Sequence, residues 1–181
     1  MIPKVYLAGP TVFHPEFAAI FSDRKKQCAD LGFEGVAPID GDAELAPATD
    51  EPAGLKLLAA AIRKANVDKI RTCDAIIADI TPFRGPGADD GTAWEMGFGE
   101  ALGKIVLAFS DDADAPYATQ VEKRLGVRPI TEENPQLVDA DGLLVENFLL
   151  AANLMLAAGP EKVMPSFKAA LARLSEILHP G

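Results

Sequence analysis

A buried strand, a loop rich in Gly, Pro and Asp, and a helix follow one another between residues 74 and 104. The segment 74–80 (DAIIADI) is almost continuously apolar, which is typical of a strand covered on both faces. The loop and helix that follow (TPFRGPGADDGTAWEMGFGEALGK) place Glu95 near the start of the helix. Ligands of α/β proteins bind outside the carboxyl ends of such strands, so we expect Glu95 at the mouth of a binding crevice.

The helix that carries Glu95 is expected to begin at Asp90 or Thr92, because both residue types are common N-caps. Glu95 then lies within about one turn of the start, where the helix dipole favours an ionised carboxylate. Phe98, Gly99 and Leu102 follow Glu95 at helical spacing, which predicts that Glu95 shares the buried face. The alternative is that Glu95 only caps the helix, as glutamates in the first turn commonly do.

Strands alternate with helices along the rest of the chain. Strands are predicted at 4–8, 33–39, 74–80 and 104–109, and helices at 15–31, 55–72 with a break near Asn66, 90–103, 148–158 and 165–178. This alternation predicts a single α/β domain over residues 1–181, with a helical tail at 159–181. We expect a flavodoxin-like, doubly wound sheet of about five mainly parallel strands with helices on both faces.

Composition narrows the functional classes. The chain has 181 residues, 49% of them apolar, and a formal net charge of −10, which argues against nucleic-acid binding and favours a small neutral or cationic substrate. Cys28 and Cys73 lack metal-type spacing and are predicted to be free thiols in the core or at its boundary, as in a reducing cytosol. With two scattered histidines and no apolar run of about 18 residues, we expect a cytoplasmic protein without a metal site or a membrane association.

Polar residues gather where the first and third predicted strands end. Tyr6 lies inside the first strand, so its buried hydroxyl needs a partner; the alternative is an ordinary core tyrosine bonded to a backbone carbonyl. Other candidates for the crevice lie in its loops and at the end of a helix: Asp40, Asp42, Asn66, Asp68, Asp89 and Asp90. For these residues, the alternatives are a solvated helix end and an N-cap.

Asn153 is the only polar side chain in the apolar segment 148–158 (FLLAANLMLAA). A lone amide in such a helix must be hydrogen-bonded, or its burial costs a few kcal/mol. One interpretation is an asparagine that fixes register in a subunit interface. The other is an asparagine that contacts a ligand from the end of a helix.

Other well-known motifs are not found. The sequence contains no Walker A motif, no GxGxxG after the first strand and no GxSxG elbow. A phospho-acceptor receiver domain would be a non-enzymatic alternative with the same fold class. Such domains place an acidic pair after the first strand, where this chain has Gly9-Pro10.

Three stretches resemble the nucleoside 2-deoxyribosyltransferase family: VYLAGP at 5–10, the long block at 65–104 and VENFLLAANLM at 145–155. The resemblance covers most of the chain in the same order, whereas the tail after Ala158 carries none of the family's motifs. It implies that Glu95 is the nucleophile and that Tyr6 orients it. It also implies that Asp89 is an acidic residue of the active site.

The resemblance further implies that Asn153 and Met155 belong to a motif that enters the active site of a neighbouring subunit. Many members carry an aspartate at the position of Asn66, so the general acid stays open among Asn66, Asp68, Asp89 and Asp90. An amide can bind but cannot act as an acid. The expected substrate-binding residues are Gly9, Asp40, Asn66, Asp68, Phe83, Asp90, Asn153 and Met155.

The activity implied by the resemblance is transfer of 2-deoxyribose between nucleobases, through a covalent deoxyribosyl–Glu95 intermediate and with retention of configuration. Its substrates would be nucleosides and nucleobases, as in purine salvage, with no cofactor and no metal. The protein would be a homo-oligomer with shared active sites. The alternatives are a nucleoside or nucleotide 2-deoxyribosyl hydrolase and a nucleoside-binding sensor without catalytic activity.

Overall fold

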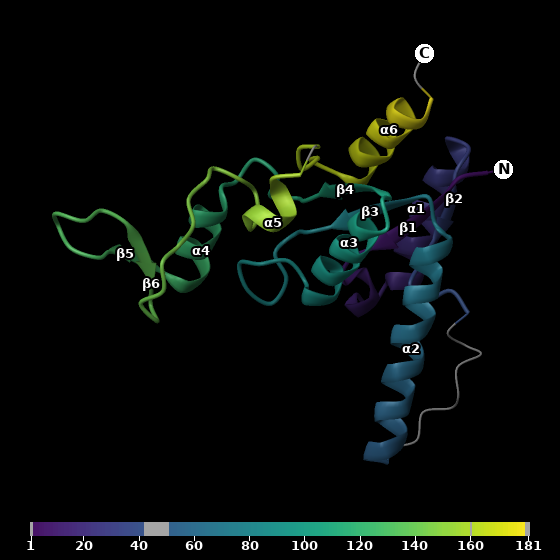
Figure 1. Ribbon diagram of the computed structural model, residues 1–181, viewed down its shortest axis with the longest axis horizontal. Coiled ribbons are helices and arrows are strands. Elements are labelled where there is room, and N and C mark those ends of the chain that lie inside the picture. The colour runs from purple at the N-terminus through teal and green to yellow at the C-terminus, as the bar shows by residue number, and fades with distance from the viewer. Residues whose placement is uncertain (1, 42–50, 160, 180–181) are drawn as a thin grey trace.

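The computed structural model describes residues 2–41, 51–159 and 161–179 (Figure 1). Its main sheet has four parallel strands in the order β2-β1-β3-β4. These are β1 (Lys4–Ala8), β2 (Glu34–Val36), β3 (Ala75–Asp79) and β4 (Ile105–Phe109). The strand order is that of a flavodoxin-like sheet, so the predicted α/β class with a parallel sheet is confirmed.

The main sheet has four strands rather than about five. At the edge of β4, Met164 forms a single parallel bridge with Phe109, through hydrogen bonds from Met164 N to Ala108 O (2.9 Å) and from Ser110 N to Met164 O (3.0 Å). The chain then turns into α6 (Phe167–Leu178), with Ser166 as its N-cap, so the pairing does not extend into a fifth strand.

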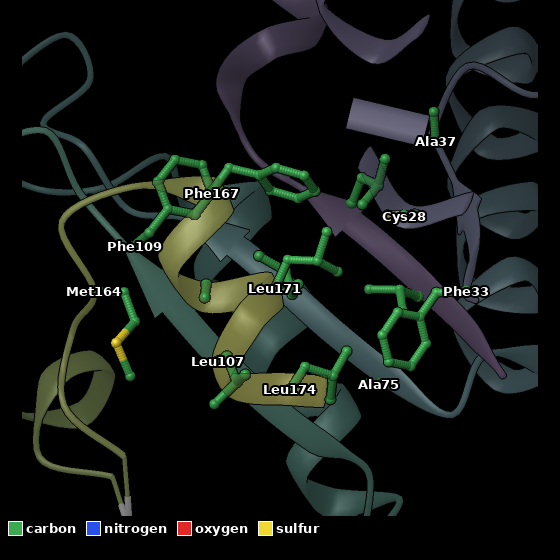
Figure 2. Close-up of a cluster of buried hydrophobic side chains, with 14 of the residues drawn as sticks. Cys28, Phe33, Ala37, Ala75, Leu107, Phe109, Met164, Phe167, Leu171 and Leu174 are labelled. Carbon is green, nitrogen blue, oxygen red and sulfur yellow. The ribbon is translucent and has the colours of Figure 1, made fainter. Parts of the chain in front are cut away.

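Helices cover both faces of the main sheet. On one face, α1 (Phe17–Asp30) and α6 (Phe167–Leu178) pack on the side chains that β1, β3 and β4 direct to that face. Figure 2 shows Phe167, Leu171 and Leu174 of α6 lying against Leu107 and Phe109 of β4. On the other face lie α2 (Pro52–Thr72) and α3 (Asp90–Ala101), which pack on the alternate residues of the same strands.

A second unit lies beside the main sheet (Figure 1). It contains α4 (Tyr117–Leu125) and the antiparallel pair β5 (Val127–Pro129) and β6 (Leu137–Asp139), and we call residues 117–149 the arm. The arm exposes several large apolar side chains: Leu125, Leu143, Leu144, Phe148 and Leu149. Because the segment 117–135 shows only weak periodicity, its sequence did not predict this hairpin.

The predicted helix at 148–158 is wrong. Only α5 (Leu154–Ala157) is helical, and Leu149 has a left-handed backbone (φ 58°), which a continuous right-handed helix cannot include. Asn153 caps α5, since its side chain accepts a hydrogen bond from Met155 N. Some apolar side chains of this segment are buried in the protein and others are exposed, and they do not follow a helical period.

Two other helix predictions need correction. α2 runs without the expected break near Asn66. α3 is capped by Asp89 instead of Asp90 or Thr92, because Asp89 Oδ2 accepts the Thr92 N–H at 2.9 Å. No helix among the described residues is long and apolar enough to span a membrane.

Both cysteines are buried and free, as predicted. Burial raises the pKa of the Cys28 thiol, and also that of Cys73, to about 11. Both therefore remain protonated at neutral pH and behave as small apolar side chains.

Candidate active site

Tyr6 and Glu95 meet between β1 and α3. The Tyr6 hydroxyl donates a hydrogen bond to Glu95 Oε1 at 2.6 Å. Tyr6 is fully buried on the face of β1 that α2 and α3 cover. Thr92 and Gly99 flank Glu95 at i−3 and i+4, and both are buried, so the predicted inward direction of Glu95 holds. The hydroxyl of Tyr6 thus has the partner that its burial requires.

The environment of Glu95 gives its carboxyl group a pKa close to neutral pH. The pKa of Glu95 is raised from its ordinary value of 4.5 to about 7, mainly by burial and also by the negative charge of Asp89. The hydrogen bond from Tyr6 and the positive charge of Lys69 act in the opposite direction. Near neutral pH, Glu95 therefore exists both as a carboxylate and as a carboxylic acid, which is the range useful for chemistry at this pH.

Asp89 combines two of the roles considered for it. Its Oδ2 accepts hydrogen bonds from Thr92 N (2.9 Å) and from Thr92 Oγ1 (3.0 Å), which caps α3. Its negative charge also acts on Glu95. Asp90, the first residue of α3, lies elsewhere: it lines a cavity of about 470 Å³ on the other side of the helix.

A cavity of about 440 Å³ opens between α2 and α3 beside Glu95. Asn66 lines it with Glu95, while Arg63 places its guanidinium 4.9 Å from the ring centre of Trp94 at the same cavity. The structure therefore brings Asn66 and Glu95 together. A cavity of this size is within the range of small-molecule sites.

Asp68 does not join this cavity. It forms surface ion pairs with Lys64 (2.6 Å) and Arg71 (3.2 Å), and the hydrogen bond from Lys64 lowers its pKa. Two helix positions correspond to a rotation of about 200°, so Asp68 points away from the side on which Asn66 lies. The expectation of a substrate contact from Asp68 finds no support in this geometry.

Lys69 is a site residue that the sequence interpretation missed. Its ammonium group donates to the Pro38 carbonyl, after β2, and to Asn66 Oδ1 at 3.4 Å. Its charge also lowers the pKa of Glu95. The available signal was its spacing of three residues from Asn66, which puts the two side chains on one face of a helix.

Asp40 lies after β2 and is engaged within the protein. Its Oδ1 pairs with Lys25 at 2.5 Å, and its Oδ2 accepts the Ala37 N–H at 2.8 Å. These bonds hold the turn at the carboxyl end of β2, at the same edge of the sheet as Glu95. Asp42, which was expected in the crevice with Asp40, lies outside the described residues.

Asp79 and Arg24 form a second polar centre that the sequence did not indicate. The Arg24 guanidinium bonds Asp79 Oδ2 (3.2 Å) and Thr11 Oγ1 (2.9 Å) and lies over the ring of Phe167. Asp79 ends β3, and Thr11 belongs to the 3-10 helix η1 (Pro10–Phe13) that follows β1. The ion pair is largely buried and ties together the loops after these two strands.

Gly9, expected as a substrate-binding residue, packs against Asp79. It has φ 147°, a conformation nearly restricted to glycine, and a Cβ on Gly9 would lie 2.6 Å from Asp79 Cβ.

We expect Gly9→Ala to lower the free energy of unfolding by about 2–5 kcal/mol, from backbone strain plus overpacking. Urea unfolding measures this, with Gly85→Ala as the control, because a Cβ at Gly85 meets nothing within 4 Å. Equal losses in both variants would contradict the close approach.

Phe83 stacks on Phe13 with ring centres 5.2 Å apart, and the Arg84 guanidinium lies 4.7 Å from the Phe83 ring centre. These aromatic residues line a cavity of about 330 Å³ that also contains Asp79. Phe83 and Glu95 therefore border different cavities in this chain. A contact between Phe83 and a substrate stays a prediction.

Asn153 and Met155 lie on the far side of α3 from the cavity that Glu95 lines. They border the cavity of about 470 Å³ that contains Asp90, Ala93 and Met96. Asn153 Nδ2 donates to Glu146 Oε2 at 2.9 Å, and Met155 is 79% exposed. Within one chain, neither side chain is placed beside Glu95.

Among the residues that the structure describes, no three His, Cys, Asp or Glu side chains gather in a way that could hold a metal ion. The polar groups at the candidate site are instead a carboxyl group, a phenol, an amide and an ammonium group, contributed by Glu95, Tyr6, Asn66 and Lys69. Such groups can bind sugar hydroxyls and base edges, and can carry out nucleophilic and acid–base chemistry.

The chain is similar to known proteins over most of its length. The sequence profile "Nucleoside 2-deoxyribosyltransferase" matches residues 5–155. The chain is similar to a 2-desoxiribosyltransferase from Leishmania mexicana, with 37% identity and a TM-score of 0.70 over 96% of this chain and 97% of that one. An uncharacterised protein of Schizosaccharomyces pombe is 34% identical over 166 residues, covering 85% of this chain and 75% of the relative.

A 2-deoxyribosyltransferase from Bacillus psychrosaccharolyticus is 26% identical, with a TM-score of 0.40 over 59% of this chain and 72% of that one. The profile match covers most of the chain and includes Tyr6, Asn66, Asp89, Glu95 and Asn153. The similarity to the Leishmania protein extends over nearly all of both chains. The protein is therefore an enzyme of the nucleoside 2-deoxyribosyltransferase family.

Proposed function

We propose that this enzyme exchanges the base of 2′-deoxyribonucleosides through a covalent deoxyribosyl ester on Glu95. The observation that carries the proposal is the hydrogen bond from buried Tyr6 to a Glu95 carboxyl whose pKa lies at about 7. A carboxylate beneath the sugar stabilises the positive charge that develops at the anomeric carbon. The Tyr6 hydroxyl fixes one carboxyl oxygen and leaves the other to attack.

In the first step, an ionised oxygen of Glu95 attacks C1′ of the sugar, and the bond from C1′ to the base nitrogen breaks. The electron pair of that bond passes to the base, which takes up a proton. In the second step, a nitrogen of the incoming base attacks C1′, and the ester bond from C1′ to Glu95 breaks. Glu95 leaves as a carboxylate, and the proton of the incoming base passes to the group that protonated the first base. Each step inverts C1′, so the exchange as a whole retains configuration.

Four residues were candidates for the proton donor. Asn66 is an amide, Asp68 is bound in surface ion pairs, and Asp90 lines a different cavity from Glu95. We assign proton transfer to Asp89, which lines neither of these two cavities but whose charge acts on Glu95. Asn66 is the residue we expect to hydrogen-bond the base, because it lines the cavity beside Glu95.

We also propose that the enzyme is a homo-oligomer with shared active sites. In its own chain, Asn153 lies away from the cavity that Glu95 lines, and Met155, Phe148 and Leu149 are all more than 60% exposed. Several large apolar side chains so exposed in one region are typical of an interaction surface. A partner that covers this surface would bring its own Asn153 and Met155 into a neighbouring pocket.

Incubation of the enzyme with deoxyinosine and adenine is expected to yield deoxyadenosine and hypoxanthine, which chromatography separates. Release of hypoxanthine without deoxyadenosine would instead indicate a deoxyribosyl hydrolase, in which water replaces the second base. Binding of deoxyinosine without any product would indicate a nucleoside sensor. The Glu95→Gln variant is the matched control, because its amide can still accept the bond from Tyr6 but is a poor nucleophile.

A further inference from the structure

Lys69 connects three parts of the candidate site. It lies on α2, its ammonium group donates to the Pro38 carbonyl that follows β2, and it donates to Asn66 Oδ1 at 3.4 Å on its own helix. The same charge acts on Glu95 of α3. One flexible side chain is thus held at the junction of α2, α3 and the carboxyl end of β2.

The contact with Lys69 sets the direction of the Asn66 amide. An ammonium group only donates, so it must face the amide oxygen rather than the amide nitrogen. With Oδ1 turned toward Lys69, Nδ2 is the group of Asn66 left to face the cavity that it shares with Glu95. Asn66 is then a donor toward a bound base, and it suits a ring nitrogen or a carbonyl oxygen.

Charged and titratable groups face Glu95 from three elements. Tyr6 on β1 donates to it, Asp89 at the start of α3 repels its ionised form, and Lys69 on α2 attracts that form. Arg63 of α2 lines the same cavity, with its guanidinium over Trp94. From the side of β2, Asp40 is already paired with Lys25. Lys69 is accordingly the cation whose charge opposes the effect of Asp89 on Glu95.

We propose that Lys69 is a positioning residue of this site: held by the Pro38 carbonyl, it directs the N–H groups of the Asn66 amide toward the base and brings a positive charge next to Asn66 at the cavity that Glu95 lines. This inference rests on the proposed function, since it assigns Lys69 to the reaction of Glu95. It also gives a role to the amide at position 66: Asn66 hydrogen-bonds the base, while the charge of Lys69 favours the ionised form of Glu95.

The ionisation of Glu95 can be measured without turnover. Protein labelled with ¹³C at the glutamate carboxyl carbons is titrated by NMR, and the Glu95 signal is identified by its loss in Glu95→Gln. In Lys69→Met we expect the titration midpoint to rise by about one pH unit, because removal of a nearby opposite charge disfavours the carboxylate. Lys69→Arg should restore the midpoint. Lys64→Met, which removes a lysine that is 79% exposed on the same helix, should leave it unchanged.

Lys69→Gln gives a second neutral variant, which can still donate to the Pro38 carbonyl if Lys69→Met folds poorly by circular dichroism. In both neutral variants, kcat/KM at pH 6 should fall about tenfold, which corresponds to the one-unit shift. The KM for the incoming base should also rise as Asn66 loses its fixed direction. An unchanged Glu95 midpoint in Lys69→Gln would overturn the role of Lys69. Absence of base exchange in the wild type would overturn the proposed function instead, and the NMR titration would still be decisive for Lys69.

Discussion

Glu95→Gln is expected to reduce base exchange by at least about three orders of magnitude, because a neutral amide cannot form the deoxyribosyl ester. Its side-chain oxygen can still accept the Tyr6 hydrogen bond, so the site keeps its shape. Helix α3 is also kept, since Asp89 rather than Glu95 provides its cap. Initial rates of deoxyadenosine formation measure the loss. Near-normal activity would remove Glu95 as the nucleophile.

The same variant should be more stable than the wild type at pH 8. The pKa of Glu95 rises from 4.5 to about 7 on folding, so the folded state binds its proton more tightly than the unfolded state. Stability is therefore lost as the pH rises from about 4.5 to 7, by up to about 3 kcal/mol at 1.36 kcal/mol per pKa unit. Glutamine is neutral at every pH and avoids this cost.

Urea unfolding of the wild type and of Glu95→Gln at pH 4.5 and pH 8 tests this effect. The two proteins should have similar free energies of unfolding at pH 4.5, and glutamine should be favoured at pH 8. A glutamate that only capped the helix would give the opposite result, a loss of about 1 kcal/mol on substitution. Equal stability of the two proteins at pH 8 would show that Glu95 carries no unusual burial cost.

Mixing inactive Glu95→Ala chains with inactive Asn153→Ala chains, after dissociation and reassembly, is expected to restore activity. If each site combines Glu95 of one subunit with Asn153 of another, random assembly of dimers leaves about a quarter of the sites with both residues intact. The restored rate should approach that fraction of the wild-type value. Steady-state assays of the mixture, with oligomers sized by light scattering, give the measurement.

Two controls keep this result interpretable. A mixture of Glu95→Ala with Glu95→Gln contains no intact nucleophile and should stay inactive. Asn153→Ser retains a side-chain cap for α5 but shortens the reach of the side chain, which separates the loss of a substrate contact from the loss of the helix cap. Verified hybrids without recovered activity, or a fully active monomer, would contradict a shared site.

The strand, loop and helix around Glu95 could be predicted from the sequence. A continuous apolar strand, a Gly- and Pro-rich loop and helical spacing after Asp89 are local signals, and each depends on residues only a few positions apart. The position of Glu95 at the carboxyl edge of the sheet then follows from the general geometry of parallel α/β proteins. The burial of Tyr6 follows from the same reasoning, because β1 is covered on both faces.

Composition was a poor guide where no period accompanied it. The segment 148–158 is almost wholly apolar, but Leu149 is 77% exposed with a left-handed backbone, and only four residues after Asn153 are helical. A high apolar content indicates that a segment is buried, either within its own chain or in an assembly of chains. It does not by itself indicate a helix.

Which polar groups share the site depends on the tertiary structure and could not be predicted from the sequence. Asn66 and Asp68 are two residues apart, yet one lines the cavity beside Glu95 and the other pairs with surface cations. Tyr6 reaches Glu95 across 89 residues of chain, and Lys69 reaches the Pro38 carbonyl across 31. Such contacts depend on how helices pack across a sheet and on which way each side chain points. Local sequence limits these variables but does not determine them, because burial and charge pairing between distant elements select among the alternatives.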